Sequence, residues 1–205
     1  MESELSQFLG AFRKPLHHRK PESRGKSWVF WSGSENNSSS ADLANPIHHK
    51  IISALSNTNI YPWMMCQFWA PVTIGGRRLL STSGQPFAVS SLSNELAVYR
   101  KNCEKYEYNI DADKIDNGGP ATAFLNRFPC LYDRQRIPDC KGMGLSVMLP
   151  ICFPSQSDCI GVLEFTIDMG DSYYVHFVLE TIKELKVAGL NVFSAQDRIP
   201  YKNRL

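Results

Sequence analysis

The chain has 205 residues, of which 43% are hydrophobic and 20% are charged, and its formal net charge is +2. This length is typical of one domain with a short extension, and the apolar share excludes a wholly disordered chain. No uninterrupted apolar run reaches the roughly 18–20 residues of a membrane span, and no apolar segment typical of a signal peptide occurs near the start. We therefore expect a soluble, intracellular protein that does not associate with a membrane.

The charge is unevenly distributed along the chain. Residues 1–26 carry six basic and three acidic side chains, whereas the remaining 179 residues carry 16 basic and 17 acidic ones. A folded DNA-binding module usually presents a basic surface of its own. We therefore expect no sequence-specific DNA binding, and we assign any attraction to polyanions to the tail. The basic stretch 13–26 is either a nuclear import patch or a solvated tail.

The cysteines and histidines do not show the spacing of a metal site. The six cysteines include no C-x-x-C pair, and the histidines are two doublets and His176. A zinc site needs four clustered ligands. We therefore predict no metal and no cofactor, and we interpret most cysteines as small buried thiols.

Residues 1–44 are predicted to be a basic, Ser/Asn-rich flexible tail, interrupted by the bulky sequence WVFW at 28–31. This aromatic cluster either docks on the folded part or binds a partner, and we favour docking. The polar sequence at 32–42 is typical of a linker.

The folded part, 45–193, shows alternating helical and strand patterns. In chain order the sequence predicts a helix at 46–57, strands at 64–69 and 77–82 joined by Gly75-Gly76, a turn at 84–86 and a helix at 94–106. A loop at 116–120, a short helical turn at 121–125 and an irregular segment at 126–142 follow. Strands at 144–152 and 159–167 and a helix at 174–190 complete the pattern, and residues 194–205 are a polar tail.

Strands that pair as hairpins, without helical crossovers between them, favour an antiparallel sheet. The predicted fold class is therefore α+β, with helices packed on an antiparallel sheet in the manner of GAF and PAS sensory modules.

Several motifs, in collinear order over about residues 46–192, resemble the first GAF-like block of the plant NIN-like proteins. The family's W-V-P and L-x-T-x-x-Q-P segments resemble Trp69-Ala70-Pro71 and residues 80–86, and its Y-R pair resembles Tyr99-Arg100. Its G-x-P-G-R-x-F, R-G-S-L-A-L-P and C-x-G-V-x-E segments resemble residues 118–124, 143–150 and 159–164.

This resemblance implies a regulatory role in nitrate-responsive transcription, in the nucleus or shared between nucleus and cytoplasm. The chain departs from the family pattern at Ala121 and Thr122, and its connection from Phe124 to Gly142 is shorter. It contains no R-W-P-x-R-K string and no C-terminal acidic–basic oligomerisation domain, so we expect a truncated, stand-alone member. The family's ligand contacts belong to a second GAF-like block, and no nitrate-binding residue is carried over.

Catalytic chemistry is not expected. The sequence has no G-x-S-x-G, P-loop or H-E-x-x-H motif. Glu164 lies in an apolar strand, where alternation turns it either inward, as a costly buried carboxylate, or outward. We expect it to face outward or to be held by an arginine, and we expect His176 to be structural.

Two non-enzymatic functions stay open. In the first, the module senses a small anion such as nitrate, and the candidate ligand-binding residues are Trp69, Arg77, Tyr99 and Arg100, since an arginine binds an oxyanion through its planar fork of donors. In the second, the chain is a dimerisation module that pairs with itself or with full-length NIN-like proteins, through the helix at 174–190 and the aromatic patch at 28–31.

Overall fold

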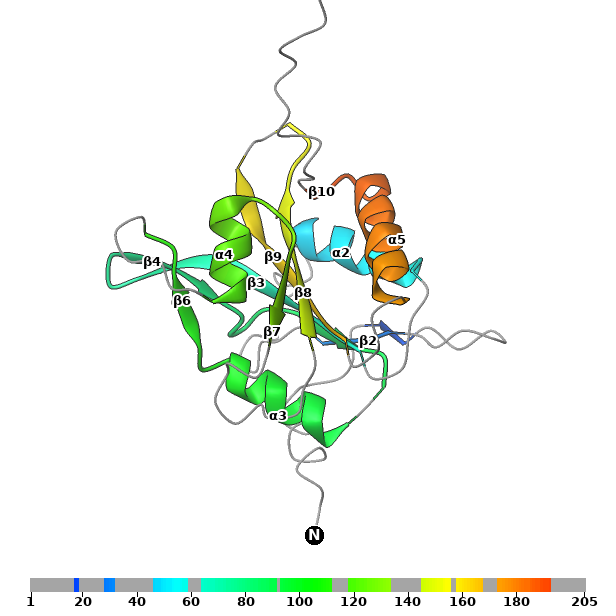
Figure 1. Ribbon diagram of the computed structural model, residues 1–205, viewed down its shortest axis with the longest axis horizontal. Helices are drawn as coiled ribbons and strands as arrows, with labels where there is room; N and C mark the ends of the chain where they lie inside the picture. Colours follow the sequence, from blue (N-terminus) through cyan, green and yellow to red (C-terminus); the bar gives the residue numbers. More distant parts are fainter. Residues whose placement is uncertain are drawn as a thin grey trace, which may run out of the picture.

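The computed structural model describes residues 17–18, 28–31, 46–58, 64–91, 93–111, 118–133, 145–155, 158–167 and 173–192. Its centre is a sheet with the strand order β1-β2-β5-β3-β9-β8-β10 (Figure 1). These strands are β1 (His17–His18), β2 (Val29–Trp31), β5 (Phe87–Val89), β3 (Met65–Ile74), β9 (Cys159–Ile167), β8 (Leu145–Cys152) and β10 (Asn191–Val192). Every pairing among the described strands is antiparallel, which confirms the predicted sheet type.

The two halves of the long strand β3 pair with different strands. Its first half lies between β5 and β9, and its second half pairs with β4 (Arg77–Ser81). The β3–β4 turn is Gly75-Gly76, and both residues have positive φ angles, 57° and 79°, which glycine adopts without steric cost. The predicted hairpin is therefore confirmed, and the β8–β9 hairpin is confirmed by its register from Leu145↔Ile167 onward.

Helices cover both faces of the sheet, as Figure 1 shows. The helices are α2 (Pro46–Ser56), α3 (Asn94–Cys103), α4 (Gly119–Asn126) and α5 (Tyr173–Val187). Helix α2 packs beside α5 on one face, whereas α3 and α4 lie against the other. The predicted α+β class, with helices packed on an antiparallel sheet as in GAF and PAS modules, is confirmed.

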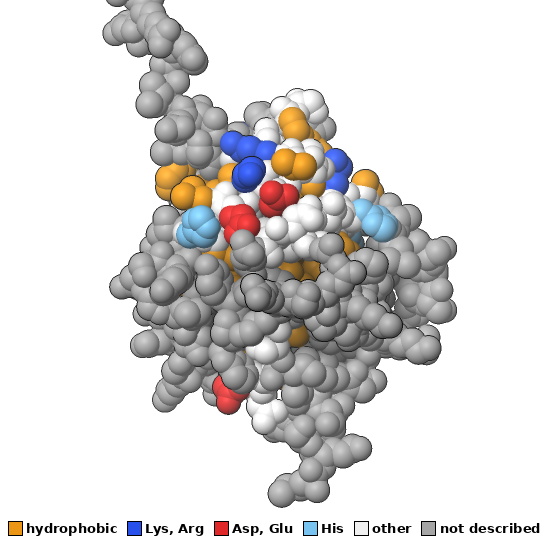
Figure 2. Space-filling model, turned by 90° about the vertical axis from the view of Figure 1, so that its right-hand side faces the viewer, with side chains coloured by type: hydrophobic (Ala, Val, Ile, Leu, Met, Phe, Trp, Pro, Cys, Tyr) orange, Lys and Arg blue, Asp and Glu red, His pale blue; other side chains and the backbone are white. Residues whose placement is uncertain are grey.

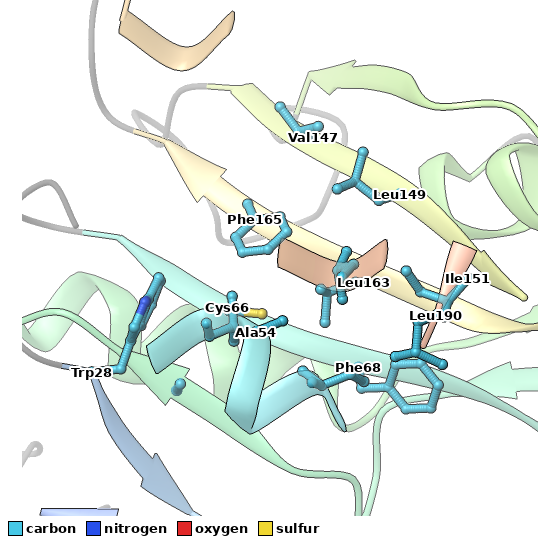
Figure 3. Close-up of a cluster of buried hydrophobic side chains, with 14 of the residues drawn as sticks. Trp28, Ala54, Cys66, Phe68, Val147, Leu149, Ile151, Leu163, Phe165 and Leu190 are labelled. Carbon is cyan, nitrogen blue, oxygen red and sulfur yellow. The ribbon is translucent and has the colours of Figure 1, made fainter. Parts of the chain in front are cut away.

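Strand alternation divides the core into two clusters, one on each face. On the α2/α5 face, Cys66 and Phe68 of β3 lie with Leu163 and Phe165 of β9 and Leu149 of β8 (Figure 3). On the α3/α4 face, the intervening β3 and β9 positions join a second cluster, which includes Met65, Trp69 and Val162. This second face contains the polar site described below.

The helix ends follow ordinary capping chemistry. Ser93 caps α3, because its side chain accepts a hydrogen bond from the Leu96 N–H at 3.0 Å. Beyond α5, Gly189 has a φ of 76°, and the Lys50 ammonium of α2 donates to the Ala188 carbonyl at 2.7 Å. The helix predicted at 94–106 ends at Cys103, and the one at 174–190 ends at Val187.

Several strands were not predicted. Residues 126–142 were expected to be irregular, but β7 (Cys130–Asp133) pairs there with β8. The strands β5, β6 (Glu107–Asn109) and β10 are two or three residues long, which is too short for a periodic pattern. No described helix has both the length and the apolar composition needed to cross a bilayer.

The aromatic segment at 28–31 docks on the domain, as favoured. Residues 29–31 form β2, which pairs with β5. Trp28 and Phe30 are 3% and 5% exposed within the α2/α5-face cluster, where Figure 3 shows Trp28. The remainder of the predicted tail, apart from β1, lies outside the described residues, as do the linker at 32–42, Cys140 and the tail at 194–205.

Candidate functional site

Glu164 is the centre of a buried polar site on the α3/α4 face of the sheet. It lies in β9 opposite Gln67 of β3 and Met148 of β8, and it is 0% exposed. Strand alternation turns it to the same face as Trp69 and Val162. The expectation that Glu164 faces outward, or is held by an arginine, was wrong: neutral donors surround its carboxylate.

Each oxygen of this carboxylate accepts two hydrogen bonds. Tyr99 of α3 and Ser146 of β8 donate their hydroxyls to Oε1 at 2.5 and 2.8 Å. Gln67 donates its amide Nε2, and Trp69 its indole Nε1, to Oε2 at 2.7 Å each. Because a buried carboxylate is costly unless its lone pairs are satisfied, these donors make the buried position tenable.

Arg100, the residue after Tyr99 in α3, occupies the neighbouring position and is also 0% exposed. Its guanidinium donates to the carbonyls of Thr82 and Gln85 at 2.8 and 3.0 Å and to the Thr82 hydroxyl. It also pairs with Glu104, one helical turn on, at 3.1 Å, and lies 4.8 Å above the Phe87 ring. The guanidinium thus fixes the loop between β4 and β5 against α3.

Gln67 joins the two charged groups. Its amide oxygen accepts a hydrogen bond from Arg100 Nη1 at 3.0 Å, while its amide nitrogen donates to Glu164. The cation and the anion are therefore linked through one neutral amide whose orientation both hydrogen bonds determine. We call Gln67, Trp69, Tyr99, Arg100, Ser146 and Glu164 the Glu164 network.

Burial changes the protonation behaviour of the groups around this network. Desolvation lowers the pKa of Arg100, and the nearby Glu104, Cys103 and Glu164 oppose that shift. Burial, followed by the negative charge of Glu164, raises the pKa values of Cys66, Cys103 and Tyr108. These thiols and this phenol are therefore neutral at physiological pH, and they are poor nucleophiles.

Three of the four predicted ligand-binding residues meet in the Glu164 network, and the fourth does not. Trp69, Tyr99 and Arg100 are buried and hydrogen-bonded to other network members or to the β4–β5 loop. Arg77 is exposed at the start of β4, where it pairs with Ile74 in the hairpin. Their assignment as ligand contacts stays a prediction.

Sequence reasoning missed the uncharged members of the site. Gln67 and Ser146 are polar residues within apolar strands, and Thr82 was treated only as the last residue of a predicted strand. A signal was available, because Gln67 alternates with Met65 and Trp69 in β3, and only a polar partner on the same face would make its burial favourable.

The chain is similar in sequence to a group of plant proteins. It is 28% identical to Protein NLP1 of Oryza sativa subsp. japonica over 149 residues, and 28% and 30% identical to Protein NLP7 and Protein NLP6 of Arabidopsis thaliana over 139 residues each. These matches cover 62–64% of this chain. The chain is therefore similar in sequence to the plant NLP proteins. The match spans only 14–16% of the length of those NLP proteins, and no family model matches the chain.

The motifs that carry the NLP resemblance meet at the Glu164 network. The W-V-P, Y-R and C-x-G-V-x-E segments supply Trp69, the pair Tyr99 and Arg100, and Glu164, while L-x-T-x-x-Q-P supplies the two carbonyls that Arg100 binds. These segments are far apart in the sequence, and the sheet register brings them together. In this chain, the segments that resemble the NLP proteins therefore meet around one buried hydrogen-bonded centre.

The glycines of the segment 118–124, which resembles the family's G-x-P-G-R-x-F, allow close packing over this centre. A Cβ atom on Gly118 would lie 2.0 Å from Tyr108 Cε1, and one on Gly119 would lie 2.5 Å from Tyr132 Cγ. Tyr108 in turn packs edge-on against Trp69, with ring centroids 5.2 Å apart. The start of α4 therefore packs closely against the rings of Tyr108 in β6 and Tyr132 in β7, and Tyr108 covers the Trp69 indole.

The arrangement does not resemble a reaction centre. His176 is exposed on α5, across the sheet from Glu164, so the two titratable groups considered for catalysis do not meet. Among the described residues, no three His, Cys, Asp or Glu side chains are grouped so that they could hold a metal ion. The Glu164 network instead orders the sheet, α3 and the β4–β5 loop with respect to one another.

Proposed function

We propose that this chain is a non-enzymatic regulatory module that acts in transcriptional regulation together with NIN-like proteins, in the nucleus or shared between nucleus and cytoplasm. The observation that carries the proposal is the sequence match to three NLP proteins. The segments of this chain that resemble NIN-like motifs converge on the Glu164 network. A buried centre hydrogen-bonded across several elements suits a module that presents surfaces to partners, because it fixes the elements around it.

The regulatory role is testable in plant cells that carry a nitrate-responsive reporter gene. The chain, fused to a fluorescent protein, is expressed with and without added nitrate, and reporter output and nuclear fluorescence are measured. We expect nuclear signal and a change in reporter output that depends on the dose of the chain. Unchanged output at every dose, with the protein present in the nucleus, would refute the role.

The partner-binding form of this function is favoured by the outer face of α5. Leu179 and Val187 are 61% and 74% exposed, and their spacing of eight residues places them two turns apart on one side of the helix. Figure 2, which views the molecule from the α2/α5 side, shows hydrophobic side chains beside charged ones on this surface. The patch at 28–31 contributes less than expected, because Trp28 and Phe30 face the core.

The partner is a second copy of this chain or a full-length NIN-like protein. Light scattering coupled to size exclusion measures self-association, and co-purification with a NIN-like relative measures the mixed complex. We expect Leu179→Ser with Val187→Ser to weaken one of these complexes. The matched control is Ile74→Ser on the β3–β4 hairpin, where the side chain is 49% exposed. A monomer that captures no relative would refute this form.

The ligand-sensing form places a small anion such as nitrate against Trp69, Tyr99 and Arg100. It is less well supported, because the donors of these side chains are already engaged with Glu164 and with the β4–β5 loop. Thermal unfolding in millimolar sodium nitrate, compared with sodium chloride at equal ionic strength, tests it. A flat response would remove the ligand-sensing form and leave the partner-binding form intact.

A further inference from the structure

The surroundings of the Glu164 carboxylate are those of a bound ligand. Its donors come from three separate elements: Gln67 and Trp69 from β3, Tyr99 from α3 and Ser146 from β8. Two donors address each oxygen, at 2.5–2.8 Å, which is the range of hydrogen bonds to a charged acceptor. None of these four donors is a cation, so the site recognises the shape of a planar oxyanion through directed hydrogen bonds.

We propose that Glu164 is a tethered ligand, a carboxylate that permanently fills an oxyanion site built by Gln67, Trp69, Tyr99 and Ser146. The site would otherwise take a small, planar monoanion, either a carboxylate or nitrate. The inference goes beyond the proposed regulatory role, which it does not require, and it predicts that the ligand-sensing form of that role fails at these residues in the wild-type chain.

The positive charge of Arg100 supports an anion in this position. Arg100 Nη1 donates a hydrogen bond to the Gln67 amide oxygen at 3.0 Å, which polarises the amide. The Gln67 amide nitrogen then donates a stronger hydrogen bond to the carboxylate at 2.7 Å. The network is arranged around a negative charge, because its donors point inward and Arg100 orients the amide so that its nitrogen faces Glu164. A neutral amide in place of the Glu164 carboxylate, as in glutamine, would direct its own N–H groups at those donors.

The tether has a consequence for regulation. Glu164 is 0% exposed, and it competes for the site as an intramolecular group whose effective concentration far exceeds that of any free anion. The wild-type module is therefore locked in its occupied form, and free anions do not alter it through this site. A change that shortens the Glu164 side chain converts the locked module into an anion-responsive one.

The substitution Glu164→Ala tests the proposal with a close chemical match. Alanine keeps the Cβ atom and removes the CH₂–COO⁻ group, whose size and shape acetate reproduces. Thermal unfolding is measured for the wild-type chain and for E164A over a series of sodium acetate concentrations, with sodium chloride at equal ionic strength as the reference. Formate and nitrate are tested in the same way, and acetamide is the neutral control of similar size.

We expect a lowered unfolding midpoint for E164A, with recovery that saturates as acetate is added. At tenfold excess over the dissociation constant, linkage gives a rise of about 3–5 °C for a protein of this size. Formate and nitrate should act in the same direction, whereas acetamide should have no effect. The wild-type chain should respond to none of them.

The matched control is Leu163→Ala, which removes a buried side chain from the adjacent position of β9 on the opposite face of the sheet. It creates a cavity without donors, so acetate should not restore its midpoint. If E164A does not fold in chloride, refolding from urea in acetate measures the same rescue, as a gain in the folded fraction.

Three results would overturn the proposal: equal responses of E164A and L163A, equal rescue by acetate and acetamide, or no rescue of E164A in either the melting or the refolding assay. A wild-type midpoint that rises with nitrate or acetate would also overturn the lock. None of these results bears on nuclear location or on reporter output, so the regulatory function is judged separately.

Discussion

A buried guanidinium is stable only when its charge and most of its donors are matched, and Arg100 is matched through both terminal nitrogens, whereas its Nε has no hydrogen-bond partner among the described residues. Thr82, Gln85 and Gln67 accept its hydrogen bonds, Glu104 supplies the opposite charge, and the Phe87 ring lies against its flat face. These contacts link α3 to the β4–β5 loop and to β3. Arg100 is therefore a positioning residue for the Glu164 network.

Replacing Arg100 by methionine should lower the free energy of unfolding by about 3–5 kcal/mol, since it leaves buried carbonyls and Gln67 without their donor. Arg100→Lys should recover only part of this loss, because an ammonium cannot reproduce the planar fork. Urea unfolding measures both values. The adjacent and exposed Lys101→Met is the matched control. A value for Arg100→Met within 1 kcal/mol of wild type would show that the guanidinium does not hold these elements together.

The buried thiols next to the network make a pH prediction possible. Desolvation, followed by the charge of Glu164, raises the pKa values of Cys66 and Cys103 above their ordinary value of 9.0. A thiol whose pKa is raised in the folded state stabilises the fold fully below the unfolded pKa, and this contribution is lost as the pH rises toward the folded pKa.

The free energy of unfolding should therefore fall above about pH 9, by up to about 1.4 kcal/mol per pH unit for each thiol. Cys103→Ala should make this fall less steep. The slope of the unfolding free energy between pH 8 and pH 10.5 is the quantity to compare, because the substitution also leaves a cavity. Val162→Ala, in the same buried cluster, is the control for that cavity and should keep the wild-type slope. Identical slopes for Cys103→Ala and wild type would contradict the assignment.

At the residue scale, the sequence allowed part of this site to be predicted. Trp69, Tyr99 and Arg100 stood out because they are polar or aromatic residues near the motifs that resemble those of the NIN-like proteins. Gln67 and Ser146 did not, since an uncharged polar residue in a strand shows its role only when its partner is known. For Gln67 the partner is Glu164, which is 97 residues away in the sequence and lies in the neighbouring strand β9.

At the element scale, the close approach of β3 and β9 depends on one glycine. A Cβ atom at Gly161 would lie 2.2 Å from the Phe68 ring and 2.7 Å from the Trp69 carbonyl oxygen. This glycine lies three residues before Glu164, in the strand that carries it. Gly161 therefore lets Phe68 lie across β9 on the α2/α5 face, while Trp69 points to the network on the other face.

Gly161→Ala should destabilise the fold by about 1–3 kcal/mol, because the added methyl group overpacks this crossing. Phe68→Leu shortens the ring side chain and should offset part of the loss, so the two substitutions should be non-additive in urea unfolding. Gly84→Ala is the control. It lies in a turn with a φ of 67°, where an added Cβ meets nothing within 4 Å, so Phe68→Leu should not alter its cost. Simple additivity of Gly161→Ala and Phe68→Leu would refute the packing argument.

Elements long enough to repeat the helical or strand pattern of apolar residues could be predicted from the sequence, and shorter ones could not. The helix at Pro46–Ser56 and the hairpin that turns at Gly75-Gly76 were recognised, because apolar spacing and turn glycines are local signals. The strand Cys130–Asp133 was missed, since only its pairing with β8 makes it a strand. Pairing partners depend on the whole sheet, which no local window contains.

At the scale of the whole molecule, a segment from outside the predicted domain completes the core. Strand β2 pairs with β5 through Phe30↔Ala88 and its neighbours, and Trp28 and Phe30 enter the α2/α5-face cluster. The polar sequence at 32–45 connects this segment to α2. We therefore expect the cooperative unit to extend beyond the predicted range 45–193 and to include residues 28–31.

Trp28→Ala should lower the free energy of unfolding by about 3–5 kcal/mol, because the indole ring is 3% exposed among apolar side chains. Trp28→Phe should cost much less. Among the described residues the indole Nε1 has no hydrogen-bond partner, so phenylalanine removes a buried unsatisfied donor while it keeps most of the apolar contact. Urea unfolding gives both values, and Val187→Ala, 74% exposed on α5, should leave the stability unchanged.

Fluorescence supplies a second measurement of the same segment. Subtracting the emission spectrum of Trp28→Phe from that of wild type isolates the Trp28 contribution, which should be blue-shifted as expected for an apolar environment. In denaturing urea this difference should shift to the red at the same midpoint as the rest of the fold, because the segment belongs to the same cooperative unit. A red-shifted difference spectrum in native buffer, together with wild-type stability for Trp28→Ala, would mean that residues 28–31 are not part of the core.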